Sequence, residues 1–316
     1  MIYSIMINFS LEKQLSILLP NTNKALAQVL KNATPKELSM LSKGKDLSSV
    51  LSSLLQKSEQ NPAQNATLLS LLKNNPTLKE LGSVTSTLKD LHQLLTQEKS
   101  PLPLEKILKN FTSGIQNISE KELKTKLQNS GVFLESKIKT QAQTPQLKDM
   151  FANDLKAALL KTQEELTNAN NPNKQELLKQ IEKLTLQIDY YQLGSHLSNA
   201  SSIYLPYSWD ALEDGNITLK KAKENRFFCD IELNLKEYGA LNLRLGMFEQ
   251  NQLSINITTQ SQELKKKIQE HLSELKKQLI SVGITPREIR FIEALATSSA
   301  YERSSEDLAM GFEVKA

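Results

Sequence analysis

The chain has 316 residues, enough for two domains or for one domain with a long additional arm. Its 39 basic and 35 acidic residues nearly balance, and few of the basic ones are Arg, which argues against a nucleic-acid-binding protein. Cys229 is the only cysteine, which excludes an internal disulfide and a thiolate metal cluster. We expect it to be a small buried residue in a strand. Most aromatic residues lie beyond position 200, which predicts that the best-packed core is C-terminal.

The first seven residues are apolar, but they lack a preceding basic region and a following small-residue cleavage site. A classical secretory signal is therefore not expected. No uninterrupted apolar run approaches the ~20 residues that span a bilayer, so we expect no stable membrane insertion. We expect the chain to be made in the cytoplasm, and export through an uncleaved N-terminal signal is compatible with these features.

Residues 1–144 predict a series of short amphipathic helices in a partly flexible region. Leucines recur at helical spacing over residues 47–55 and again from Leu68 to Leu72. Prolines at Pro62, Pro76 and Pro103 are expected to end these helices, because the residue before a proline avoids the α conformation.

Residues 145–200 predict an antiparallel helical hairpin. Apolar residues follow one helical face over 145–168 and again over 174–197, and a short Asn-rich turn separates the two segments. Charged pairs such as Glu164 and Glu165 are interpreted as solvated surface groups.

Residues 201–295 predict a small C-terminal domain. Beyond Ser202 the apolar period changes from helical to two, which is the period of a strand. A turn is expected over 213–216, and apolar and polar residues then alternate over 227–235, 241–247 and 253–258. Tight turns between these segments favour an antiparallel meander with one apolar and one solvent-facing side.

A helix is predicted after this meander. Ser261 or Thr259 can cap its start and Gly283 ends it. One apolar stripe follows this helix and consists of Leu264, Ile268, Leu272, Leu275, Leu279 and Val282. The stripe has to cover the apolar face of the sheet, because neither element can bury itself alone. Ile289 and Phe291 suggest a last strand, and residues 296–316 a loose tail. The predicted fold class is α+β: a helical N-terminal region, then an antiparallel sheet packed by one helix.

Two motifs stand out in the C-terminal part. A strand leads through a turn ending in Gly239 into a strongly alternating strand with Leu241, Leu243 and Leu245. The predicted helix then carries the pattern Leu-x-x-Leu-basic-x-x-Leu-x-x-x-Gly, formed by Leu272, Leu275, Leu279 and Gly283. In this order and spacing, residues 227–291 resemble the C-terminal domain of the flagellar hook-length control family.

The resemblance implies a protein without enzymatic activity or cofactor, exported through the flagellar type III apparatus during hook growth. Its N-terminal arm would gauge hook length in contact with hook or hook-cap proteins. Its C-terminal domain would contact the cytoplasmic domain of the export-gate switch protein and change export from hook to filament proteins. The alternative is a helical scaffold or adaptor outside flagella that carries the same domain.

The sequence predicts no catalytic, cofactor or metal site. The three histidines, His92, His196 and His271, have no partner at metal-ligand spacing, and there is no arrangement typical of a nucleophile or a phosphate loop. The candidate docking residues for an acidic partner are the lysines of the predicted C-terminal helix, Lys265, Lys266, Lys267, Lys276 and Lys277. Because Glu263, Glu270 and Glu274 share this helix, a solvated face with salt bridges is the simpler interpretation.

Overall fold

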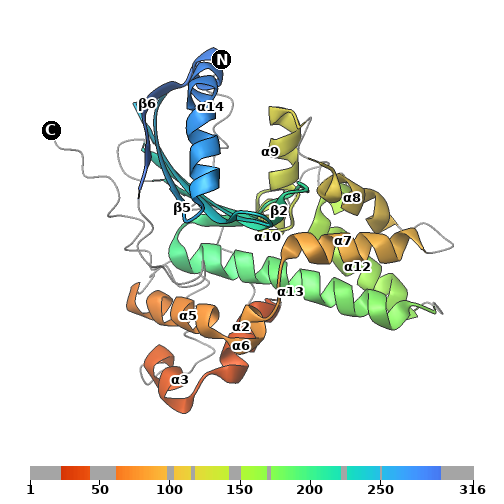
Figure 1. The fold of residues 1–316 in the computed structure, drawn as a ribbon. Helices are drawn as coiled ribbons and strands as arrows, with labels where there is room; N and C mark the ends of the chain where they lie inside the picture. The colour runs from red at the N-terminus through yellow and green to blue at the C-terminus, as the bar shows by residue number, and fades with distance from the viewer. Residues whose placement is uncertain are drawn as a thin grey trace.

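The computed structural model describes residues 23–42, 62–97, 103–114, 118–141, 151–168, 172–221, 226–249 and 251–292. A helical part formed by the described residues from Lys24 to Ser198 lies beside a six-stranded sheet that carries one long helix, α14 (Gln262–Ser281) (Figure 1). The predicted α+β class is confirmed. The leucine run over residues 47–55 and the tail over 296–316 lie outside the described residues.

The helices before the predicted hairpin are short. They are α2 (Lys24–Asn32), α3 (Pro35–Ser42), α5 (Pro62–Asn74), α6 (Pro76–Lys79), α7 (Val84–Thr96), α8 (Pro103–Thr112), α9 (Glu120–Gln128) and α10 (Leu134–Gln141). The three prolines named above do more than interrupt helices, because α5, α6 and α8 each begin at one of them. At this position the missing N–H would have had no helical partner anyway. Asn75 completes the start of α6, where its side chain accepts a hydrogen bond from the N–H of Leu78 at 3.2 Å.

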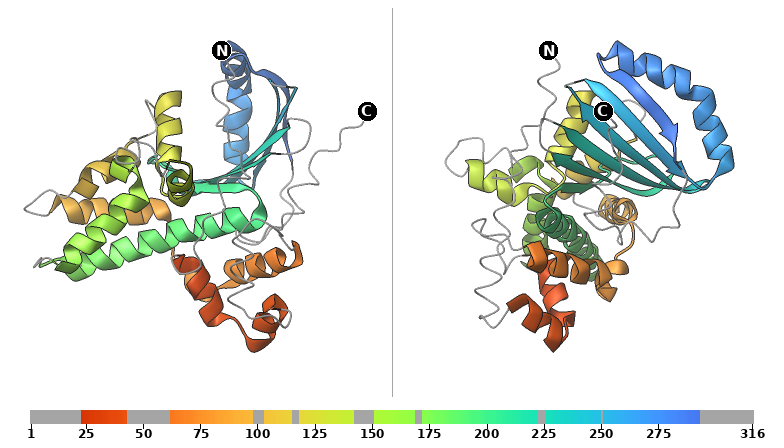
Figure 2. Two further views of the ribbon diagram at one scale, coloured as in Figure 1. Left: turned by 180° about the vertical axis from the view of Figure 1, so that it is seen from behind. Right: turned by 90° about the vertical axis from the view of Figure 1, so that its left-hand side faces the viewer.

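Helices α12 (Leu155–Asn168) and α13 (Lys174–Ser198) pack against each other, as the hairpin prediction requires. Asp154 separates the helical residues 151–153 from α12 and caps the start of α12. Its Oδ1 accepts hydrogen bonds from the N–H groups of Lys156 and Ala157 at 3.0 and 3.3 Å. Helix α13 runs through the middle of the helical part, with other helices on both sides (Figures 1 and 2).

Helix α13 contributes side chains to two separate apolar cores. The first helical core joins α7, α8, α12, the first half of α13 and the first strand through Leu88, Leu91, Leu104, Leu108, Leu155, Leu159, Leu177, Ile181, Leu184, Ile188, Ile203 and Tyr204. The second helical core joins α2, α3, α5, α6 and the end of α13 through Ala25, Leu26, Val29, Leu41, Leu68, Leu72, Leu78, Leu193 and Leu197. The largest fully buried side chains belong to these two cores, so the prediction of a best-packed C-terminal core was wrong. Leucine-rich helices on both sides of α13 enclose more apolar side chains than one sheet face under one helix.

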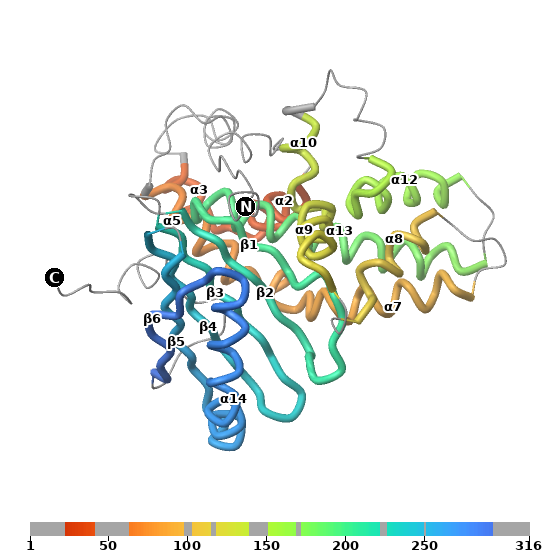
Figure 3. Tube along the Cα trace, turned by 90° about the horizontal axis from the view of Figure 1, so that it is seen from above, coloured from red at the N-terminus to blue at the C-terminus, as the bar shows by residue number. Residues whose placement is uncertain are grey.

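The strands are β1 (Ser201–Tyr204), β2 (Leu212–Lys221), β3 (Phe227–Leu235), β4 (Gly239–Phe248), β5 (Gln252–Thr259) and β6 (Thr285–Phe291). They lie in sequence order, antiparallel from β1 to β5, whereas β6 pairs parallel to β5 after α14 (Figure 3). The predicted meander and last strand are confirmed, and β1 and β2 are additional strands.

The turn expected over 213–216 was wrong, because these residues lie within β2. Gly215 pairs with Leu233 of β3, and a register shift lies between Leu212 and Asp214. A Cβ atom on Gly215 would lie 2.5 Å from the side chain of Leu205. The glycine therefore allows the strand to pass close to the chain that follows β1, and does not mark a turn.

The polar face of the sheet is not simply open to solvent. One cross-strand row of polar residues traverses all six strands: Ser202, Thr218, Asp230, Arg244, Asn256 and Arg290. Arg244 contacts Asp230 at 2.8 Å, and Arg290 donates to Asn256 Oδ1 at 2.8 Å. Asp230 is 8% and Asn256 3% exposed. Buried polar groups need partners, and these cross-strand pairs supply them.

Candidate docking surface on the C-terminal domain

Helix α14 covers only part of the apolar face of the sheet. It packs against β5 and β6 (Figures 1 and 3), and the apolar residues of β5 beneath it, Leu253, Ile255 and Ile257, are buried. The residues beside them on the same face are only half-buried; they are Leu219, Cys229, Ile231, Leu243, Leu245 and Met247. We call this set the open apolar face. Contiguous apolar surface of this kind is typical of a contact site.

The motif leucines lie at the border of this surface. Leu241 is buried, whereas Leu243 and Leu245 belong to the open apolar face. On α14 only Leu264 is buried, so Leu272, Leu275 and Leu279 also keep part of their surface exposed. The motif therefore builds a helix-on-sheet unit that is not sealed on the side of β2 to β4.

The two motif glycines have backbone roles. Gly239 follows the three-residue loop between β3 and β4 with φ of 70°, as expected for a glycine at the end of such a loop. Gly283 ends α14 with φ of 82°, and its N–H donates to the carbonyl of Ile280 at 2.9 Å. The next N–H, from Ile284, reaches back to Leu279 at 2.9 Å, which completes a Schellman motif. At the other end of α14, Ser261 is the cap, accepting from the N–H of Leu264 at 3.2 Å.

The structure separates the candidate lysines into two groups. Lys265 lies over the Phe291 ring, 5.5 Å from its centroid. Lys267 pairs with Glu263 at 2.8 Å and lies 4.8 Å from the centroid of the Tyr238 ring. These contacts raise the pKa of Lys267. Lys265 and Lys267 thus attach α14 to β6 and to the β3–β4 loop.

The other three lysines, Lys266, Lys276 and Lys277, are exposed, and none of the described carboxylates forms an ion pair with them. Helical periodicity places Lys266 and Lys277 opposite the apolar stripe of α14, and Lys276 on the flank between them and the stripe. Ile280 lies on the same side and is 62% exposed. We call Lys266, Lys276, Lys277 and Ile280 the basic face. It combines positive charge with an apolar contact.

Cys229 lies in the open apolar face, and the rate at which its thiol reacts can be measured. Burial, with a smaller contribution from Asp230, raises the pKa of its thiol to about 12. Only the thiolate attacks a disulfide reagent, and at pH 8 little thiolate is present. Allowing for the greater nucleophilicity of a high-pKa thiolate, we expect the folded chain to react roughly 100-fold more slowly than a free cysteine. Absorbance at pH 8 with an aromatic disulfide reagent measures this rate. The urea-unfolded chain is the control, and equal rates in both states would contradict the burial of Cys229.

The other candidate groups of the described residues lie apart from one another. The three histidines lie in three different helices, α7, α13 and α14. Among the described residues, no group of His, Cys, Asp and Glu is arranged to hold a metal ion. None of the described helices combines the length and the apolar character required to cross a membrane.

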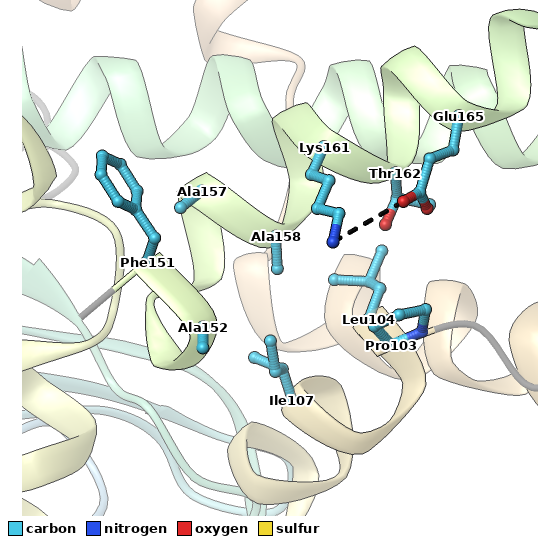
Figure 4. A pocket seen from close by; sticks show the side chains of 10 residues that line it. All are labelled: Pro103, Leu104, Ile107, Phe151, Ala152, Ala157, Ala158, Lys161, Thr162 and Glu165. Atoms are coloured by element: carbon cyan, nitrogen blue, oxygen red, sulfur yellow. Dashed lines mark ion pairs between the residues drawn. The ribbon is translucent and has the colours of Figure 1, made fainter. Parts of the chain in front are cut away.

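An apolar pocket of about 330 Å³ lies between α8 and α12 (Figure 4). Apolar side chains form most of its lining, among them Leu104, Ile107, Phe151 and Ala158. Its polar edge includes a long ion pair, Lys161 to Glu165 at 3.8 Å. The volume is at the lower end for ligand pockets, and its polar groups do not converge on one point, so we assign it no ligand.

Comparison with known families concerns the sheet and α14. Residues 216–294, a quarter of the chain, match the model of the family described as flagellar hook-length control protein FliK. The matched segment extends from β2 past β6 and includes the open apolar face and the basic face. No curated protein and no solved structure matches the chain. The C-terminal sheet with its covering helix is therefore a domain similar to that of flagellar hook-length control proteins.

Proposed function

We propose that this protein controls flagellar hook length and switches type III export from hook to filament proteins, by protein–protein contact and without covalent chemistry. The observation that carries this proposal is the match of residues 216–294 to the hook-length control family. The match covers the C-terminal domain, so the switching half of the function has more support than the measurement of length.

The proposed partner of the C-terminal domain is the cytoplasmic domain of the export-gate switch protein. Lys266, Lys276 and Lys277 are available for acidic groups of this partner, because no described carboxylate pairs with them. Ile280 would add an apolar contact at the centre of such an interface. Lys265 and Lys267, already engaged within the domain, are the weaker candidates.

The N-terminal region is the proposed partner of hook or hook-cap proteins. The division into an arm (1–144), a helical hairpin (145–200), a C-terminal domain (201–295) and a tail (296–316) stays a prediction. Contacts do cross the boundary at residue 200, since the Tyr204 hydroxyl donates to the carbonyl of Ser130 at 2.6 Å. The protein would be made in the cytoplasm and exported through the flagellar apparatus.

Deletion of the encoding gene tests the proposal. We expect overlong hooks and few filaments, because export would not change from hook to filament proteins. Electron microscopy of isolated hooks measures their length, and expression of the full chain from a plasmid should restore it. A deletion strain with hooks of normal length and complete filaments would refute this function and favour the non-flagellar scaffold.

A further inference from the structure

One buried carboxylate in the middle of α13 joins three helices. The Oδ1 atom of Asp189 lies 2.7 Å from Lys156 Nζ of α12. Its Oδ2 atom accepts a hydrogen bond from the backbone N–H of Lys24, the first residue of α2, at 2.7 Å. The Asn23 side chain, which caps α2, also donates to the backbone carbonyl of Asp189 at 3.1 Å. Asp189 thus holds the start of α2 with one oxygen and α12 with the other.

The side chain of Asp189 is fully buried and that of Lys156 is 4% exposed. Lys156 also pairs with Glu135 of α10 and donates to Gln192 Oε1 at 2.7 Å. Because Lys156 has these further partners, its charge does not depend on α2 for compensation. The contact between Asp189 and α2 can therefore open without leaving an unpaired lysine behind.

This arrangement lies at the junction of the two helical cores. Among the buried residues of α13, Ile188 is the last of the first helical core and Leu193 the first of the second. Between and before them, partly buried residues pack on both cores: Leu186 and Tyr190 on the second, and Tyr191 on the first. Helices α2, α3, α5 and α6, within residues 23–42 and 62–81, surround the second core, and we call them the N-terminal layer. The layer therefore has an apolar core of its own and meets α13 beside Asp189.

The described end of the layer also has a polar attachment to α13. The Gln187 side-chain amide donates to the carbonyls of Leu81 and Gly82 at 3.1 and 3.0 Å. Gly82 has φ of 66° and open space around its Cα, so it can serve as the hinge at which the layer meets α7.

We propose that Asp189 is a latch that holds the N-terminal layer on α13, and that the layer opens as one unit while the first helical core stays packed. Opening separates the second core and breaks the bond from the Lys24 N–H, but leaves Lys156 paired with Asp189 and Glu135. This inference does not require the function proposed above.

Substitution of Lys24 tests the latch with matched variants at one position. Lys24→Pro removes the N–H that Asp189 accepts, and proline is favourable at the first position of a helix. Lys24→Ala removes the same side chain but keeps the N–H. By hydrogen exchange on the full chain, we expect amides of α2, α5 and α6 to exchange about 10- to 100-fold faster in Lys24→Pro than in Lys24→Ala. Amides of α12, of the first half of α13 and of the sheet should be unchanged.

Glu120→Pro is the control for proline itself, because Glu120 is exposed and is likewise the first residue of its helix, α9. It should leave exchange in the N-terminal layer unchanged. Equal exchange in Lys24→Pro and Lys24→Ala would overturn the latch, and faster exchange throughout the chain would overturn the separate opening of the layer. In the unsubstituted protein at low denaturant, the layer should open before α12. If the N-terminal layer and α12 opened together at the same denaturant concentration, this would also contradict the proposal.

Discussion

Replacement of Lys156 with methionine is expected to lower the free energy of unfolding by about 3–5 kcal/mol, although the two side chains are similar in size. The side chain of Lys156 is 4% exposed and is the partner of both Asp189 and Glu135. Removing its charge leaves two carboxylates close together without their cation. The free-energy cost of keeping these two carboxylates out of water is larger than the gain from burying one more apolar side chain.

The destabilisation caused by Lys156→Met should depend on pH, because the pKa values of Lys156 and Asp189 are shifted. Burial lowers the pKa of Lys156, but attraction by Asp189 and Glu135 outweighs it and raises the pKa above its usual value. The stability that Lys156 contributes is therefore fully present below its unfolded pKa and is lost only as pH rises through the higher folded pKa. Burial raises the pKa of Asp189, and without Lys156 this carboxyl would take up a proton more readily. The difference in the free energy of unfolding between the Lys156→Met variant and the wild type should consequently shrink as pH falls from 7 towards 4.

Urea unfolding followed by circular dichroism at pH 7 and pH 5 measures both effects. Lys161→Met is the matched control on the same helix, because Lys161 is 68% exposed and its pair with Glu165 is long. An exposed pair of this kind contributes less than about 1 kcal/mol. A Lys156→Met variant as stable as the control would contradict the assignment of the cluster as a structural element.

The largest functional effect is expected from charge reversal on the basic face. The combined substitution Lys266→Glu, Lys276→Glu and Lys277→Glu should weaken binding to the cytoplasmic domain of the export-gate switch protein by roughly 100-fold or more, because like charges would face each other in the interface. The fold should persist, since none of the three lysines pairs with a described carboxylate. Titration calorimetry with the purified partner domain measures the affinity, and circular dichroism checks the fold.

Lysines elsewhere provide the control for net charge. Lys161, Lys179 and Lys183 are charged residues of α12 and α13, outside the matched region and outside the arm proposed to contact hook proteins. Their combined change to Glu alters the net charge by the same amount and should leave binding within a few-fold of wild type at physiological salt, where distant charges are screened. Equal losses in both triple variants would assign the effect to overall charge and not to the basic face.

Much of the C-terminal domain was predictable because its signals are local. Alternation over β3, β4 and β5 sets which side chains share a face, and Ser261 and Gly283 mark the ends of α14. The sequence also offers five candidate lysines, whose docking role stays a prediction. Sequence order groups Lys265 with Lys266, whereas the helix turns one towards Phe291 and the other to solvent.

The helical part was harder to predict, because its organising contacts are distant in sequence. Lys156 and Asp189 are indistinguishable from surface charges on amphipathic helices, and 33 positions separate them. Their burial follows from the packing of α13 between two cores, which no single helix pattern reveals. Gly215 was misinterpreted as a turn residue for a related reason, since the side chain that requires it belongs to Leu205 beyond the strand.

The length of hooks in living cells tests the central claim most directly, namely that the C-terminal domain switches export by contact through the basic face. Electron microscopy would compare hooks from a deletion strain complemented with the wild-type chain, with the triple variant of Lys266, Lys276 and Lys277, and with the control triple variant. We predict overlong hooks without filaments for the basic-face variant, and hooks of normal length with filaments for the other two. Normal hooks and filaments in the basic-face variant, expressed at the wild-type level, would contradict the account.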